Sequence, residues 1–93
     1  MHNYEIVIII HPDLDEEAIN QALDKIKDWI TKAGGTIEKL DNWGKRILSY
    51  EIQKQNEGIY YLFNTSMPTA AVGELERNMI TLEPVMRHLI VAK

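Results

Sequence analysis

The chain has 93 residues, 45% of them hydrophobic, and a formal net charge of -4. A chain of this length buries only about 60 to 65% of its unfolded surface, so we expect a single domain over residues 1–93. It has no cysteine, which excludes disulfides and thiolate zinc sites, and its longest apolar run, residues 6–10, is far too short to span a bilayer.

The first third of the chain predicts a strand followed by a helix. Residues 3–10 are rich in Ile and Val, and Pro12 ends the strand because proline lacks the N–H that a ladder needs. Asp13, followed three residues later by Glu16, resembles a capping box at the start of the helix, and Gly34-Gly35 supplies its end. Between these points apolar residues recur at helical spacing, at Ile19, Leu23, Ile26 and Ile30.

The segment after this helix predicts one long strand over residues 36–53. The side of the strand that carries the apolar residues changes between Ile37 and Leu48. A strand changes its buried side where an extra residue is inserted, so we expect a bulge or bend near Gly44.

The last part of the chain repeats the strand, helix and strand order. Residues 55–58 predict a turn, and residues 59–67 predict the strand that follows it. A second helix is predicted to begin at Pro68 and to be broken by Pro84, before a final strand at residues 85–92.

Two strand–helix–strand units joined by a tight turn predict the α+β class. The expected architecture is a ferredoxin-like α/β sandwich of βαββαβ order, with right-handed crossovers. Two helices would then cover one face of a four-stranded antiparallel sheet. Successive strand residues point to opposite faces, so the residues on the face without helices should be polar.

Several strands are nevertheless apolar on both sides. The positions expected to face away from the helices include Val7, Ile9, Tyr60, Leu62, Leu89 and Val91. A contiguous apolar patch usually marks a binding surface, and we interpret this one as a protein-binding face. The alternative is that the central strands of a small sheet carry such residues without a partner.

The sequence gives little support for catalysis or metal binding. The three histidines lack close metal-ligand spacing, so we predict no metal site. The acids of residues 15–17 are explained by the helix dipole, Gly34-Gly35 lacks the pattern of a phosphate loop, and Ser49 has no basic neighbour that would activate it. The residues alone therefore indicate no catalytic or cofactor site, and an enzyme built on a dimer of this fold stays a weaker alternative.

A basic, aromatic segment precedes the apolar part of the long strand. Trp43 is followed by Gly44 and then by Lys45 and Arg46, a composition suited to base stacking and phosphate contact. The net charge of -4 argues against nucleic acid, but much of the acidity lies in the first helix and Glu83 is the last acid. The residues alone leave open a structural alternative, in which the indole caps the core and the cations aid solubility.

Four segments of the chain resemble the sixth protein of the bacterial small ribosomal subunit. They are residues 4–12, residues 43–52 with their Trp-Gly-Lys-Arg and Leu-Ser-Tyr runs, residues 58–61, and residues 85–91. Together they cover essentially the whole chain in register. The resemblance implies a ferredoxin-like fold without enzymatic activity or cofactor. It also implies a cytoplasmic location in the ribosome, or in an organelle of bacterial descent, and a monomer outside the ribosome.

The same resemblance implies binding to the central domain of small-subunit ribosomal RNA, jointly with the eighteenth small-subunit protein. Carried onto this chain, the RNA-binding residues would be His2, Tyr4, Trp43, Lys45, Arg46 and Arg87. The protein-partner face would comprise Ile47 together with Val7, Ile9, Tyr60, Leu62, Leu89 and Val91. The family commonly has arginine at position 2 and a polar residue at position 47, so His2 and Ile47 depart from its pattern.

A different class of function stays open from the residues. The same fold with an apolar sheet face often forms dimers around a ligand, which makes a small dimeric ligand-binding or regulatory domain the alternative. A monomer that co-sediments with small subunits would favour the ribosomal interpretation, and a dimer that does not would favour the alternative.

Overall fold

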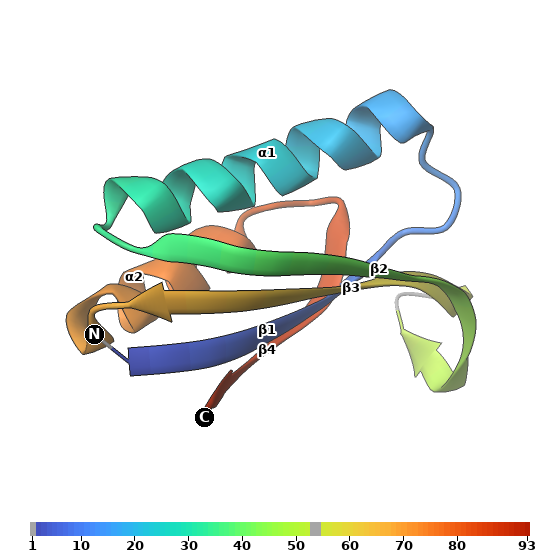
Figure 1. Ribbon diagram of the computed structural model, residues 1–93. Helices are drawn as coiled ribbons and strands as arrows, with labels where there is room; N and C mark the ends of the chain where they lie inside the picture. The colour runs from blue at the N-terminus through green and yellow to red at the C-terminus, as the bar shows by residue number, and fades with distance from the viewer. Residues whose placement is uncertain (1, 53–54) are drawn as a thin grey trace.

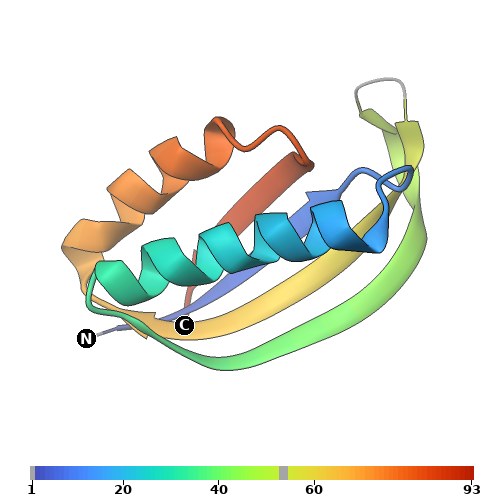
Figure 2. The same ribbon diagram turned by 90° about the horizontal axis from the view of Figure 1, so that it is seen from above.

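The computed structural model describes residues 2–52 and 55–93. Its elements are β1 (His2–Ile10), α1 (Glu16–Lys32), β2 (Thr36–Ile52), β3 (Gln55–Met67), α2 (Thr69–Ile80) and β4 (Val85–Ala92). The strands form one antiparallel sheet in the order β2-β3-β1-β4, and both helices lie on the same face of it (Figures 1 and 2). The predicted ferredoxin-like α+β fold is therefore confirmed.

The main core lies between the helices and the sheet. β1 directs Ile6, Ile8 and Ile10 into it, and Phe63 of β3 lies beside them, all four fully buried. On α1 the apolar stripe predicted from the spacing is buried as expected. The face of the sheet away from the helices, called the open face below, is thus free to present the alternate residues.

The start of α1 differs from the prediction. The N-cap is Asp15, not Asp13, and its Oδ1 accepts a hydrogen bond of 2.9 Å from the backbone N–H of Ala18. Asp15 has the extended backbone of a cap residue, while Glu16 and Glu17 occupy the first turn and interact favourably with the helix dipole. The capping residue is the last acid before the helix because only there does the carboxylate reach the free N–H groups.

The predicted bulge in β2 is confirmed. The pairing with β3 shifts register between Asn42 and Gly44, and Gly44 has a φ of +79°, which a side chain would disfavour. Ile37 packs against the main core, whereas Leu48 belongs to a cluster on the open face. The predicted strand end, Gln53, lies outside the described residues.

Two predicted boundaries in the second half are wrong. Residues 55–58 are not a turn but the start of β3, where Gly58 pairs with Arg46 in a long twisted hairpin. α2 ends at Ile80, capped by Thr81, so Pro84 follows the helix and does not break it. β4 begins at Val85 and ends at Ala92 as predicted.

Candidate functional site

The open face is organised in cross-strand rows that follow from the pairing registers. One row joins Gly44, Tyr60, Ile9 and Arg87, one residue from each strand. Adjacent strands are about 4.8 Å apart, so Tyr60 and Arg87 are separated by about 10 Å. The basic side chain of β4 is thereby placed on the same face, and at the same end, as the aromatic side chain of β3.

The basic segment of β2 reaches this same end of the sheet. Arg46 stacks over Trp43, with 5.9 Å between its guanidinium carbon and the centre of the ring, within the range of a cation–π contact. Trp43 is 44% exposed and takes no part in either hydrophobic cluster, so it does not cap the core. Trp43, Arg46, Ile47 and Tyr60 line a shallow hollow of about 290 Å³.

A small second core holds the hairpin against the open face. Ile9 of β1, Leu48 of β2 and Met86 of β4 are each only 8% exposed and form a cluster against which Tyr60 packs. Residues from four strands therefore meet on the side without helices. This cluster fixes where the basic segment of β2 lies relative to Arg87.

The apolar centre of the open face is the next row along the strands, formed by Asp41, Leu62, Val7 and Leu89. Leu89 and, one row further, Val91 are 59% and 44% exposed. Leu62 faces the open side as predicted but is only 8% exposed, as is Ile9. The accessible part of the predicted protein face is thus concentrated toward β4.

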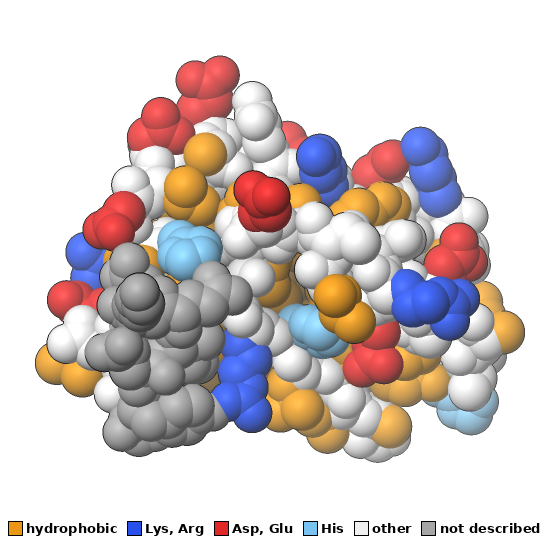
Figure 3. Space-filling view, turned by 180° about the vertical axis from the view of Figure 1, so that it is seen from behind, with side chains coloured by type: hydrophobic (Ala, Val, Ile, Leu, Met, Phe, Trp, Pro, Cys, Tyr) orange, Lys and Arg blue, Asp and Glu red, His pale blue; other side chains and the backbone are white. Residues whose placement is uncertain are grey.

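Figure 3 views the molecule from behind and shows this surface along its lower rim, away from α1. Hydrophobic side chains gather there beside a basic one, whereas the upper part carries acidic and basic side chains together.

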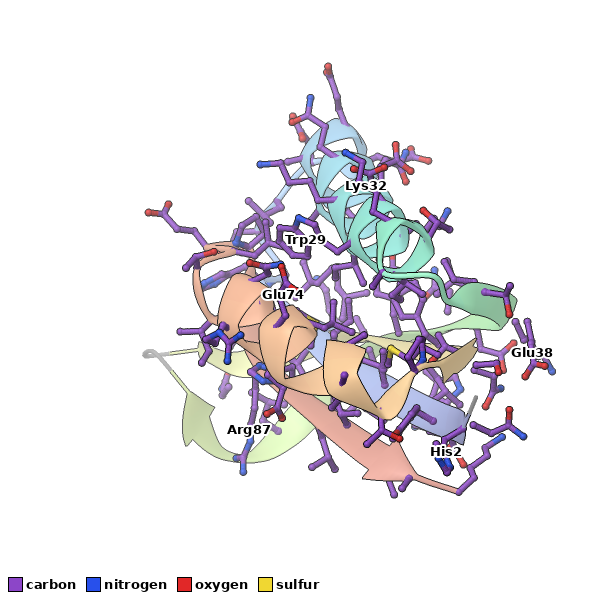
Figure 4. The ribbon with its side chains drawn as sticks, turned by 90° about the vertical axis from the view of Figure 1, so that its left-hand side faces the viewer. His2, Trp29, Lys32, Glu38, Glu74 and Arg87 are labelled. Carbon is purple, nitrogen blue, oxygen red and sulfur yellow. The ribbon has the colours of Figure 1, made fainter. Side chains whose placement is uncertain are left out.

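Three of the predicted RNA-binding residues do not join the others on the open face. Lys45 pairs with Ile59, whose side chain packs against the main core, so the Lys45 side chain lies on the helix side of the sheet. His2 begins β1, seven residues from Ile9, which corresponds to about 23 Å along a strand; Figure 4 shows His2 and Arg87 at opposite ends of the sheet. Tyr4 is 7% exposed and packs in the main core. Its ring therefore offers little surface to a base. The sequence indicates this burial, because Tyr4 lies on the same side of the strand as Ile6, Ile8 and Ile10.

Sequence reasoning did not anticipate the polar end of the open face. Lys93 Nζ donates a hydrogen bond of 2.8 Å to Asn64 Oδ1 and lies 3.8 Å from Glu5 Oε1. Both partners belong to the row that ends at Val91. These interactions join residues that are far apart along the chain, so nothing in the local sequence could have indicated them.

The described ranges were expected to hold no metal site, and their acidic and histidine side chains are dispersed. No three His, Asp or Glu side chains of residues 2–52 and 55–93 lie close enough together to hold a metal ion. Within the same ranges, neither helix is long and apolar enough to cross a membrane.

Comparison with known proteins decides the family. A family model described as ribosomal protein S6 matches residues 3–92. The chain belongs to the ribosomal protein S6 family. Members of this family are structural components of the ribosome and not enzymes, which confirms the expectation from the sequence.

Curated relatives and solved structures agree with this family. Small ribosomal subunit protein bS6 of Clostridium acetobutylicum is 46% identical over 92 residues, covering 99% of this chain and 97% of the relative. The corresponding protein of Desulforamulus reducens is 42% identical over 91 residues, with 98% and 96% covered. The crystal structure of 30S ribosomal protein S6 from Thermotoga maritima superposes with a TM-score of 0.93 at 28% identity, covering 99% of this chain and 87% of that one.

A more distant structural likeness concerns the fold alone. The C-terminal domain of the MgtC protein from Mycobacterium tuberculosis has a TM-score of 0.69 at 12% identity, covering 100% of this chain and 88% of that one. The same architecture thus serves proteins of different kinds, and the function of an S6 family member has to be argued from its surface.

Proposed function

We propose that this chain binds small-subunit ribosomal RNA with the basic end of its open face and a second ribosomal protein with the apolar part of that face. The curated relatives are small ribosomal subunit proteins, which supports a structural role in that subunit. Following the resemblance of the sequence, the RNA is the central domain and the protein is the eighteenth of the small subunit.

The observation that carries the proposal is the convergence of cations and an aromatic ring from separate strands. Arg46 comes from β2 and Arg87 from β4, and Tyr60 lies between them on the same face. Arg46 and Arg87 are exposed, so both reach phosphate groups without desolvation of a buried charge. Trp43 and Tyr60 add ring surface for stacking on an unpaired base.

The apolar part of the face lies directly beside this basic end. Leu89 is two residues after Arg87 and points to the same side, because both are paired in the same register with β1. Val7 and Leu62 extend the apolar row toward the middle of the sheet. A protein docked on Leu89 and Val91 would therefore touch RNA held at Arg87, which provides a physical route for cooperation.

The overall charge favours such cooperation. With 14 acids against 10 lysines and arginines, the isolated chain is repelled by RNA at long range. A basic partner on the apolar face reverses the local potential. By linkage, each protein then raises the RNA affinity of the other by the same factor.

The test is a titration of labelled central-domain RNA with this chain, with and without the eighteenth protein. We expect weak binding by the chain alone at physiological salt, and a gain of at least about tenfold with the partner, equivalent to about 1.4 kcal/mol of coupling. Tight, specific binding by this chain alone would contradict the cooperative mechanism. Sedimentation of the free chain as a dimer would instead favour a dimeric ligand-binding domain.

A further inference from the structure

β4 is an edge strand whose outer backbone groups can be identified. The backbone N–H of Lys93 donates to the carbonyl of Asn3 at 3.0 Å, and this pair continues the register of β4 with β1. In an antiparallel ladder, alternate residues bond the neighbour and the residues between them point the other way. The N–H and C=O groups of His88, Ile90 and Ala92 therefore point outward.

No strand in the part of the chain that the structure describes pairs with this outer side of β4. Natural proteins protect such an edge with charged residues, prolines or bulges, because unpaired ladder groups recruit other chains. Residues 89–92 of β4 read Leu-Ile-Val-Ala and carry no charge. The only irregularity in the β1–β4 pairing lies between Ile9 and Ile10, at the other end of β4.

The opposite edge of the same sheet is protected by both charge and bulges. β2 carries charged side chains at Glu38, Lys39, Asp41, Lys45 and Arg46. Its pairing with β3 also shifts register at three places. The two edges thus differ within one sheet, and the regular, apolar stretch of edge is residues 89–92 of β4.

The surroundings of β4 suit an added strand. On the open face Leu89 and Val91 are 59% and 44% exposed, and on the helix side Ile80 is 73% exposed. A hollow of about 280 Å³ opens beside the start of β4, lined by Met79, Ile80, Val85, Met86, Arg87 and His88. It offers space for a side chain of the incoming segment.

We propose that the protein partner of this chain inserts an extended segment along β4 as a fifth strand, bonding the outward groups of His88, Ile90 and Ala92. This inference rests on the proposed function and adds the mode of docking to it. Main-chain hydrogen bonds supply the register, and apolar side chains of the segment continue the row of Val7 and Leu89. The apolar edge and the apolar face would then be covered by one partner.

Amide hydrogen exchange tests the proposal directly on the full chain. In the free, isotope-labelled protein the amides of His88, Ile90 and Ala92 should exchange rapidly, and those of Leu89 and Val91 slowly, because only the latter bond β1. Adding the eighteenth small-subunit protein should slow exchange at the three outward amides by at least about tenfold. A complex in which these three amides still exchange rapidly would mean docking on the face alone, and would overturn the inference.

A proline variant gives an independent readout. Ala92→Pro removes one outward N–H at an exposed position while keeping the bonds to β1, since edge strands accept proline on their solvent side. We expect about a tenfold loss of partner affinity with an unchanged melting temperature. Ala92→Ser is the matched control, because it keeps the N–H and should bind normally.

Three further outcomes would each contradict a different part of the proposal. Protection of the outward amides in the free chain that rises with protein concentration would show a second copy at this edge, and would overturn the partner strand. No complex at all with the eighteenth protein would remove the proposed function together with this inference. If Ala92→Pro bound the partner with normal affinity although the outward amides are protected in the complex, the outward backbone hydrogen bonds would not contribute to binding, and the inference would be overturned.

Discussion

The Cβ atom that Gly58 lacks would lie 2.3 Å from Cγ2 of Ile9, closer than a side chain can come. Gly58 opposes Arg46 in the β2–β3 hairpin, and Ile9 belongs to the small core on the open face. The absence of a side chain thus lets the hairpin lie close to β1. The basic segment depends on this close approach for its position beside Arg87.

Gly58→Ala should destabilise the protein by about 1 to 3 kcal/mol, the usual cost of overpacking a well-filled site. Urea unfolding followed by fluorescence measures it. In the double variant Gly58→Ala with Ile9→Ala, the removed Ile side chain leaves space, so the two effects should compensate in part. Strictly additive losses of stability in the double variant would show that the two side chains do not meet.

Leu89 and Leu62 lie in one row but should respond differently to an introduced charge. Leu89→Asp should leave the melting temperature nearly unchanged, because that side chain is 59% exposed, yet weaken capture of the eighteenth protein. Leu62→Asp places a charge at a site only 8% exposed and should unfold or strongly destabilise the chain. Thermal melts and partner pull-down measure both. Normal partner binding by Leu89→Asp would rule out the apolar face as the binding surface.

The salt dependence of RNA binding should identify the cations that neutralise phosphates. Replacing Arg46 or Arg87 with alanine should reduce the slope of log affinity against log salt by about 0.7 to 0.9 for each phosphate that is no longer neutralised. Lys25→Ala is the control, since this exposed cation lies on α1, on the other side of the sheet. If the control changes the slope as much as the two variants do, the attraction is not localised at the basic end.

The cap of α1 provides a test of the corrected helix start. Asp15→Ala removes the acceptor for the N–H of Ala18 and should cost about 1 kcal/mol of stability. Asp15→Asn keeps an oxygen acceptor and removes only the charge, so its destabilisation should be clearly smaller. Chemical denaturation of both variants measures the difference. Equal destabilisation would assign the effect to charge and not to the hydrogen bond.

Tyr61 should make the protein less stable at alkaline pH. Its burial, and secondarily the negative charge of Glu16, raise the pKa of the Tyr61 hydroxyl above its usual value of 10.0. Below about pH 10 the hydroxyl is protonated in both states and stability is unaffected. Above it the unfolded chain loses this proton first, so stability falls as the pH rises through the raised pKa.

Tyr61→Phe should therefore flatten the alkaline limb of a plot of unfolding free energy against pH. Absorbance titration of the tyrosinate gives a second measurement. An unchanged alkaline limb in Tyr61→Phe would show that another group causes the fall in stability.

The sequence predicted the elements best where the signal is local. The spacing of Ile19, Leu23 and Ile26 determines the buried side of α1, and the change of apolar side along β2 located the bulge at Gly44. The predicted start of β3 was wrong because the polar composition of residues 55–58 is typical of a turn. What makes it a strand is the pairing of Gly58 with Arg46 across a hairpin whose length no local pattern reveals.

For the site too, the sequence predicts which face of the sheet a side chain lies on, but not how deeply that side chain is buried. The alternation of β1 and β4 correctly predicted that Val7 and Leu89 share the open face. It could not predict that Ile9 is already covered by Leu48 and Met86, which come from distant parts of the chain. Exposure depends on how strongly the hairpin twists over the sheet, and that is a property of the whole assembly of strands.

The bond between Lys93 and Asn3 also determines how the molecule can be labelled. Because these residues are neighbours in the sheet, a tag or fluorophore on either end of the chain leaves from one corner, as the termini in Figure 1 indicate. That corner is far from the hairpin, so a label there reports RNA binding without touching Arg46. It is adjacent to Ala92, however, so a bulky C-terminal fusion would compete with a strand arriving at β4. Affinity measurements with the partner are therefore best made with the dye at an exposed position of α1, such as Lys25, on the other side of the sheet.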